Sequence, residues 1–81
     1  MLKDVVEVKP LGDYRLYLRF EDNVDGEIDL SEIVQFKGVF ESLRDRVKFQ
    51  EVTVNRELGT ICWPNGADVA PDVLYAKLTK A

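Results

Sequence analysis

The chain has 81 residues and a formal net charge of −4, with 46% hydrophobic and 32% charged residues, which predicts one folded domain over residues 1–81 and excludes intrinsic disorder. The acidic balance argues against a protein whose main task is to grip nucleic acid, because that task requires clustered lysines and arginines. There is no membrane-length apolar run, no signal-peptide pattern at Met1–Asp4 and only one cysteine, Cys62, so we expect a cytoplasmic protein without membrane association.

Alternating apolar residues predict three antiparallel strands in the first thirty or so positions. The first strand contains Val5, Val6 and Val8 and ends at the turn Pro10–Asp13. The second is predicted over Tyr14–Phe20, with a core face made by Tyr14, Leu16, Leu18 and Phe20. Residues 21–26 are typical of a hairpin turn, formed by Asp25-Gly26, and a short return strand follows over Glu27–Leu30.

The rest of the chain predicts short helices and a second hairpin. A helical turn is expected over Ser31–Val34 and a short helix over Val39–Arg46, with an inward stripe of Phe40, Leu43 and Val47. Strands over Glu51–Asn55 and Thr60–Trp63 flank a turn at Arg56–Gly59. A last helix begins at Pro71, which suits a first helical position, and turns Leu74, Tyr75 and Leu78 inward.

The predicted order is therefore β-β-β-α-α-β-β-α. Strands gather at both ends of the chain around short helices, and no crossover is long enough for a parallel βαβ unit. The fold class that this order indicates is α+β, a small antiparallel sheet with short helices packed on it.

The residue inventory is poor in catalytic chemistry. The chain has no histidine, which removes imidazole-activated nucleophiles and most zinc sites. Cys62 lies in an apolar strand beside Trp63 and is interpreted as a small buried hydrophobe. The glycines are scattered singly, without a phosphate-binding loop. We predict that the protein is not an enzyme and has no catalytic residue or cofactor, although chemistry with carboxylates alone stays open.

Residues 21–32 align with the calcium-binding loop of an EF-hand, with Asn23, Asp25, Gly26 and Glu32 at its third, fifth, sixth and twelfth positions. Two features oppose that interpretation. Glu21 stands where the loop requires Asp, and the preceding residues have the periodicity of a strand where an EF-hand needs a helix. We interpret the segment as a hairpin turn, predict no metal site, and keep small-ligand or calcium binding there as an alternative function.

A local basic patch is the first candidate for a partner-binding surface. Arg44 and Arg46, with Lys48 nearby, are interrupted by Asp45. A solvated helix face is the simple interpretation, and contact with an acidic partner or a phosphate is the functional one.

The second candidate is the run Trp63–Asp72. Each residue there has a local structural explanation: Trp63-Pro64 ends a strand, Asn65-Gly66 forms a tight turn, and Asp68 accepts backbone N–H bonds near the last helix. The functional interpretation is that Trp63, Asn65, Asp68 and Tyr75 border a binding groove, since a large aromatic residue beside polar groups is typical of an interface anchor.

The chain resembles a family of small bacterial proteins grouped as domain of unknown function 2442. The markers cover nearly the whole chain: Leu11–Leu16 entering a strand that ends at Phe20, Asp25-Gly26, Gly38-Val39-Phe40, Leu43-Arg44-Asp45 followed by Phe49, and above all Trp63–Tyr75. The turn before Asp25-Gly26 departs from the family by being longer and more acidic. The resemblance implies an antiparallel sheet with short helices and no established activity. It also implies a gene that often lies beside one for another small protein, as in toxin–antitoxin pairs, with a helix-turn-helix added in some members.

We therefore predict a non-enzymatic protein-interaction or regulatory module, an antitoxin-like partner of a neighbouring gene product. The expected partner is another small protein, and a homo-oligomer is a further option because an exposed strand edge invites pairing. Direct nucleic-acid binding is not expected. The alternatives are the ligand- or calcium-binding domain described above and a DNA-associated regulator acting through a partner.

Overall fold

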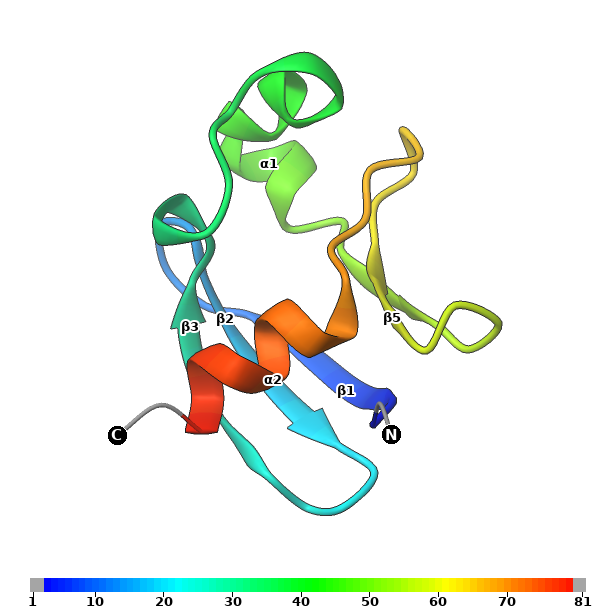
Figure 1. Cartoon of the computed structure of the whole chain (residues 1–81). Helices are drawn as coiled ribbons and strands as arrows, with labels where there is room; N and C mark the ends of the chain where they lie inside the picture. Colours follow the sequence, from blue (N-terminus) through cyan, green and yellow to red (C-terminus); the bar gives the residue numbers. More distant parts are fainter. Residues whose placement is uncertain (1–2, 80–81) are drawn as a thin grey trace.

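The structure, a computed structural model that describes residues 3–79, contains two antiparallel sheets joined by short helices (Figure 1). The larger sheet has the order β1-β2-β3, with β1 at Val5–Pro10, β2 at Arg15–Phe20 and β3 at Asp25–Asp29. The smaller sheet pairs β4 (Thr53–Asn55) with β5 (Thr60–Cys62). In the sequence, three short helices separate the two sheets: the 3₁₀ helices η1 (Leu30–Glu32) and η2 (Gly38–Arg44) and the α-helix α1 (Arg46–Phe49). Helix α2 (Pro71–Thr79) follows β5. This order confirms the predicted α+β fold.

Strand β2 is the centre of the larger sheet and has the alternation predicted for it. Leu16, Leu18 and Phe20 are fully buried, whereas the residues between them lie on the opposite, partly exposed face. Helix α2 crosses the buried face of this sheet (Figure 1) and adds the fully buried Leu74 to the core. The inward stripe predicted for this helix is confirmed, because Tyr75 and Leu78 also pack against the core.

One hydrophobic cluster extends through both sheets and the helices. At one end of the molecule the Phe20 ring meets Tyr75 edge-on, with ring centres 5.0 Å apart. Near the short helices Phe49 lies 5.9 Å from Trp63 and 5.4 Å from Tyr14, measured between ring centres. The core thus contains two groups of aromatic rings, one beside α2 and one beside the short helices. Within the described residues, no helix is both long enough and apolar enough to cross a membrane.

The β2–β3 turn differs from the prediction, because Asp25-Gly26 begins β3 and does not form the turn. The turn lies at residues 21–24, and Asn23 supplies the left-handed residue, with φ of 69°. Gly26 has a different role. A Cβ atom there would lie 3.1 Å from the Leu78 side chain, so the missing side chain lets α2 approach the strand closely.

The predicted helix over Val39–Arg46 is interrupted at Asp45. The Asp45 carboxylate accepts the backbone N–H of Val47 at 2.9 Å and caps a new helix, α1. Because α1 starts anew after this break, its core-facing residues differ from those predicted for one continuous helix. Val47, predicted to face inward, is 73% exposed, and Phe49 is buried instead.

Asp68 and Cys62 also differ from their predicted roles. Asp68 was expected to cap the last helix, but within residues 3–79 its side chain accepts no hydrogen bond, and its backbone bridges to Cys62 as an extra residue of the smaller sheet. Cys62 is only half-buried, with its sulfur 3.9 Å from the Thr53 hydroxyl. The bridge to Cys62 keeps the chain extended at Asp68, where a cap would require it to turn.

Candidate partner-binding site

The turn after β5 packs against the short helices. We call this region the helical end and define it as η2, α1 and the turn Trp63–Gly66. Trp63 is 2% exposed, and its indole N–H donates to the Phe49 carbonyl at 2.8 Å. Its ring also meets Phe40 edge-on, with ring centres 6.3 Å apart. Trp63 therefore supports this surface from beneath.

Asn65 fastens the turn to η2. Its side-chain amide donates to the Val39 carbonyl at 2.8 Å and to the Ser42 hydroxyl at 2.9 Å. Its side-chain oxygen accepts the backbone N–H of Ala67 at 3.0 Å, which closes the turn locally. One amide thus connects segments that lie 26 residues apart.

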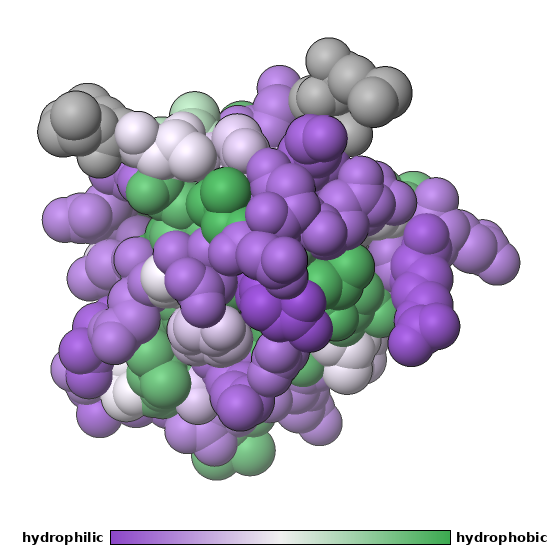
Figure 2. Space-filling model, turned by 90° about the horizontal axis from the view of Figure 1, so that it is seen from below, coloured by the Kyte–Doolittle hydropathy of each residue, from purple (hydrophilic) through white to green (hydrophobic). Residues whose placement is uncertain are grey.

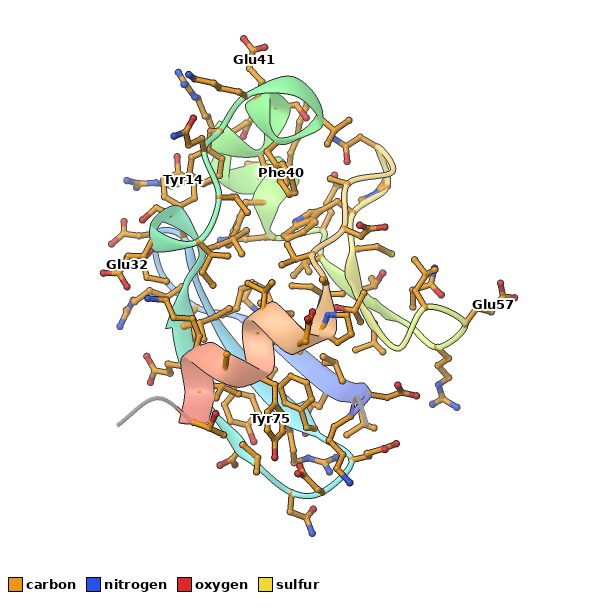
Figure 3. The ribbon with its side chains drawn as sticks, in the orientation of Figure 1. Tyr14, Glu32, Phe40, Glu41, Glu57 and Tyr75 are labelled. Carbon is orange, nitrogen blue, oxygen red and sulfur yellow. The ribbon has the colours of Figure 1, made fainter. Side chains whose placement is uncertain are left out.

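A shallow hollow of about 310 Å³ lies where the turn meets the helices. Its lining includes the apolar side chains of Leu43, Trp63 and Pro64 and the charged Lys48 and Glu51. Figure 3 shows Phe40 pointing from η2 into the protein and Glu41 pointing away from it. The helical end therefore has an anchored inner side and an accessible outer side.

The predicted basic residues lie on that outer side. Arg44 and Arg46 are exposed, and the Arg46 guanidinium lies 3.2 Å from the carboxylate of Asp13. The Arg44 carbonyl accepts the Tyr14 hydroxyl at 2.5 Å, which fixes the end of η2. Because both partners of the Arg46–Asp13 pair are more than half exposed, this pair contributes little to stability.

Two exposed valines accompany these charges. Val39 is 56% exposed in η2 and Val47 is 73% exposed in α1. Neither valine was among the residues predicted for the site from the sequence. A signal for Val47 was present: Asp45 stands two residues before it as a cap, and Arg46 and Lys48 flank it.

Of the predicted site residues, Trp63, Asn65, Arg44 and Arg46 belong to the helical end or its support, whereas Tyr75 lies elsewhere. The Tyr75 hydroxyl donates to the Asp22 carboxylate at 2.6 Å, which joins α2 to the β2–β3 turn. This bond lowers the pKa of Asp22 and raises the pKa of Tyr75 above its ordinary value. Figure 3 shows the Tyr75 side chain projecting from α2, away from Phe40. Asp68 is exposed beside β5, so the structure does not bring all the predicted residues into one groove.

The acidic segment 21–32 forms a hairpin turn and an edge strand, with its carboxylates directed to separate protein groups. Asp25 accepts the Tyr17 hydroxyl at 2.9 Å, which raises the pKa of Tyr17. Glu27 lies 3.4 Å from Arg15, and Asp29 caps η1 through the Ser31 N–H. Within residues 3–79, no group of three or more histidine, cysteine, aspartate or glutamate side chains is placed to hold a metal ion.

The opposite end of the molecule is predominantly polar. Figure 2, seen from below the view of Figure 1, shows hydrophilic side chains over most of that face and apolar ones in small separate areas. On the outer face of the larger sheet, Glu7 accepts from Arg19 at 3.1 Å and lies 3.3 Å from Lys9. The Arg19 hydrogen bond is the main reason that the pKa of Glu7 is lowered.

Comparison with known proteins gives a family and no activity. No curated protein and no solved structure matches the chain. A family model matches residues 5–80, nearly the full length. The chain belongs to the family described as "Protein of unknown function (DUF2442)".

Proposed function

We propose that this protein is a non-enzymatic interaction module that binds another small protein, as the antitoxin-like or regulatory member of a two-gene pair. The observation that supports it best is the exposure of two apolar side chains of the helical end, Val39 in η2 and Val47 in α1. Covering apolar surface stabilises a complex by about 25 cal/mol per Å². Arg44, Arg46 and Lys48 supply the polar surroundings that interfaces have at their rims.

The way the helical end is held adds to this support. Side chains of Tyr14, Trp63 and Asn65 donate to carbonyls of η2 and α1, so the outer surface is already in one shape before a partner arrives. A preformed surface loses less conformational entropy on binding, and more of the contact free energy then appears as affinity.

The alternatives have less support. Calcium binding at 21–32 would require carboxylates that converge on one point, and those present face separate donors. A DNA-contacting role for Arg44, Arg46 and Lys48 would need a continuous positive track, and Asp13 and Asp45 interrupt it.

Co-expression with the product of the adjacent gene, followed by native mass spectrometry, tests the proposal. We expect a complex, and we expect Val47→Asp to weaken it about tenfold or more, because a charged group replaces buried apolar surface. The matched control is Leu58→Asp, which changes another exposed apolar residue, 53% accessible, in the turn between β4 and β5. A chain that stays alone would contradict the proposal, as would equal weakening by both variants.

A further inference from the structure

Strand β3 forms one edge of the larger sheet and, in the part of the chain that the structure describes, pairs with no strand other than β2. Within residues 3–79, the backbone of Asp25–Asp29 makes no hydrogen bond outside the β2–β3 ladder. Figure 1 shows β3 at the margin of the sheet, with α2 crossing the face of the sheet. A row of backbone donors and acceptors is therefore available along this edge.

The register identifies which backbone groups point outward. The bonds Phe20 N–H to Val24 C=O and Leu30 N–H to Tyr14 C=O fix the hydrogen-bonded pairs at both ends of the hairpin. Antiparallel ladders alternate, so Leu18–Gly26 and Leu16–Ile28 are the bonded pairs between them. The N–H and C=O groups of Asp25, Glu27 and Asp29 consequently face away from β2.

The same three residues are acidic. Their side chains alternate with the buried Ile28, so they lie on the outer face of the sheet. A second copy of the chain pairing on this edge would bring carboxylates beside carboxylates, which is unfavourable. A strand with lysine or arginine at alternate positions would bring opposite charges together instead.

The other edge of this sheet is protected in a different way. Strand β1 has an irregularity between Val5 and Glu7, ends in Pro10, which has no N–H, and is bonded through Val5 to the Gly59 carbonyl. Bulges, prolines and covering loops block any added strand. At β3 the charge excludes strands of like charge only.

We infer that β3 binds an extended basic segment of a partner protein as a fourth strand of the sheet. Main-chain bonds to Asp25, Glu27 and Asp29 would supply affinity, and the three carboxylates would select basic side chains. The Tyr17–Asp25 bond, the exposed Arg15–Glu27 pair and the bonds from Ser31 to Asp29 do not use all the acceptor positions of these carboxylates. The inference rests on the proposed function and specifies the chemistry of the partner.

The probe is a synthetic peptide of about seven alternating lysines and threonines, with a glutamate–threonine peptide as its comparison. On binding, we expect slowed hydrogen exchange of the Asp25, Glu27 and Asp29 amides. Glu27→Lys should weaken binding of the lysine peptide roughly fivefold to tenfold. Glu57→Lys makes the same charge change in the β4–β5 turn (Figure 3) and should bind as the original chain does.

A backbone variant separates hydrogen bonding from charge. Glu27→Pro removes an N–H that faces outward and should abolish binding, while the β2–β3 amide signals report whether the hairpin is intact. Equal weakening by Glu27→Lys and Glu57→Lys would overturn the inference, because attraction by net charge alone would then explain binding. Binding of the glutamate peptide, or protection confined to the helical end, would also overturn it. A native complex that survives Glu27→Pro but not Val47→Asp would overturn this inference and leave the proposed function standing.

Discussion

The two ends of this molecule are held together by different forces. At the sheet end, the β2–β3 hairpin and α2, a continuous ladder and the buried stripe of Leu16, Leu18 and Phe20 are enough. The two helices of the helical end are a 3₁₀ helix and a four-residue α-helix, which are too short to be stable alone. Side chains outside these helices hold them in place, because Tyr14, Trp63 and Asn65 donate directly to carbonyls of η2 and α1. The helical end therefore depends on side-chain hydrogen bonds, whereas the sheet end depends on a backbone ladder.

The largest loss of stability is expected on substitution of Trp63, which holds the helical end. We expect Trp63→Ala to lower the free energy of unfolding by about 3–5 kcal/mol, because it removes both the buried ring and the donor to Phe49. Trp63→Phe keeps an aromatic ring but leaves that carbonyl without its donor, and should cost about 1–3 kcal/mol. Urea denaturation of both variants measures the difference. A Trp63→Phe chain as stable as the original would show that this hydrogen bond does not hold the helical end.

A smaller change tests whether the two ends open separately. Asn65→Ala removes the bonds to Val39 and Ser42 and should cost about 1 kcal/mol. Hydrogen exchange should accelerate in η2 and stay unchanged in β2, because the lost bonds hold only the helical end. Asn55→Ala is the matched control, since among the described residues the Asn55 side-chain oxygen accepts only the nearby N–H groups of Glu57 and Leu58. Equal acceleration in β2 would mean that the two ends open as one unit.

The smallest expected effect concerns the Tyr75–Asp22 bond at the sheet end. The folded-state pKa of Asp22 is lowered, so its contribution is present above the unfolded pKa and is lost as pH falls through the folded value, below about pH 4. The pKa of Tyr75 is raised, so its contribution is present below the unfolded value, about 10, and is lost as pH rises through the folded one.

Tyr75→Phe should therefore flatten both the acid and the alkaline limb of a plot of melting temperature against pH. The shift should be small, because both groups are accessible to water. Tyr17→Phe is the comparison and removes the raised tyrosine pKa beside Asp25, so we expect its alkaline limb to flatten. An acid limb unchanged in Tyr75→Phe would contradict the role given to this bond.

The contrast between the ends also explains what the sequence could predict. The β2 alternation was readable because burial of one sheet face imposes a period of two on neighbouring residues. Which residues of the short helices face the core could not be predicted, because the cap at Asp45 starts a new helix in which Val47 faces outward. The hairpin turn was predicted at Asp25-Gly26, because this pair is typical of a turn with left-handed backbone. In the structure Asn23 adopts the left-handed conformation, so the turn lies earlier in the chain.

The candidate site was predictable only in part. The turn at Asn65-Gly66 has a local signature, and its residues were selected for that reason. Its contacts are long-range: the Trp63 indole reaches a carbonyl 14 residues away, and Asn65 reaches one 26 residues away. No local pattern encodes such distances, so the burial of Trp63 and the exposure of Val39 emerged only with the structure.

The contact between α2 and the β2–β3 hairpin determines when, during synthesis, the buried face of the larger sheet becomes fully covered. Asp22 and Tyr75, which it joins, are 53 residues apart. During synthesis the meander β1–β3 can pair early, but the cluster that buries Leu16, Leu18 and Phe20 is complete only once Leu74 has been made. The nascent chain therefore carries an apolar sheet face that is only partly covered until α2 has been made, the kind of state in which unfinished chains aggregate or engage chaperones.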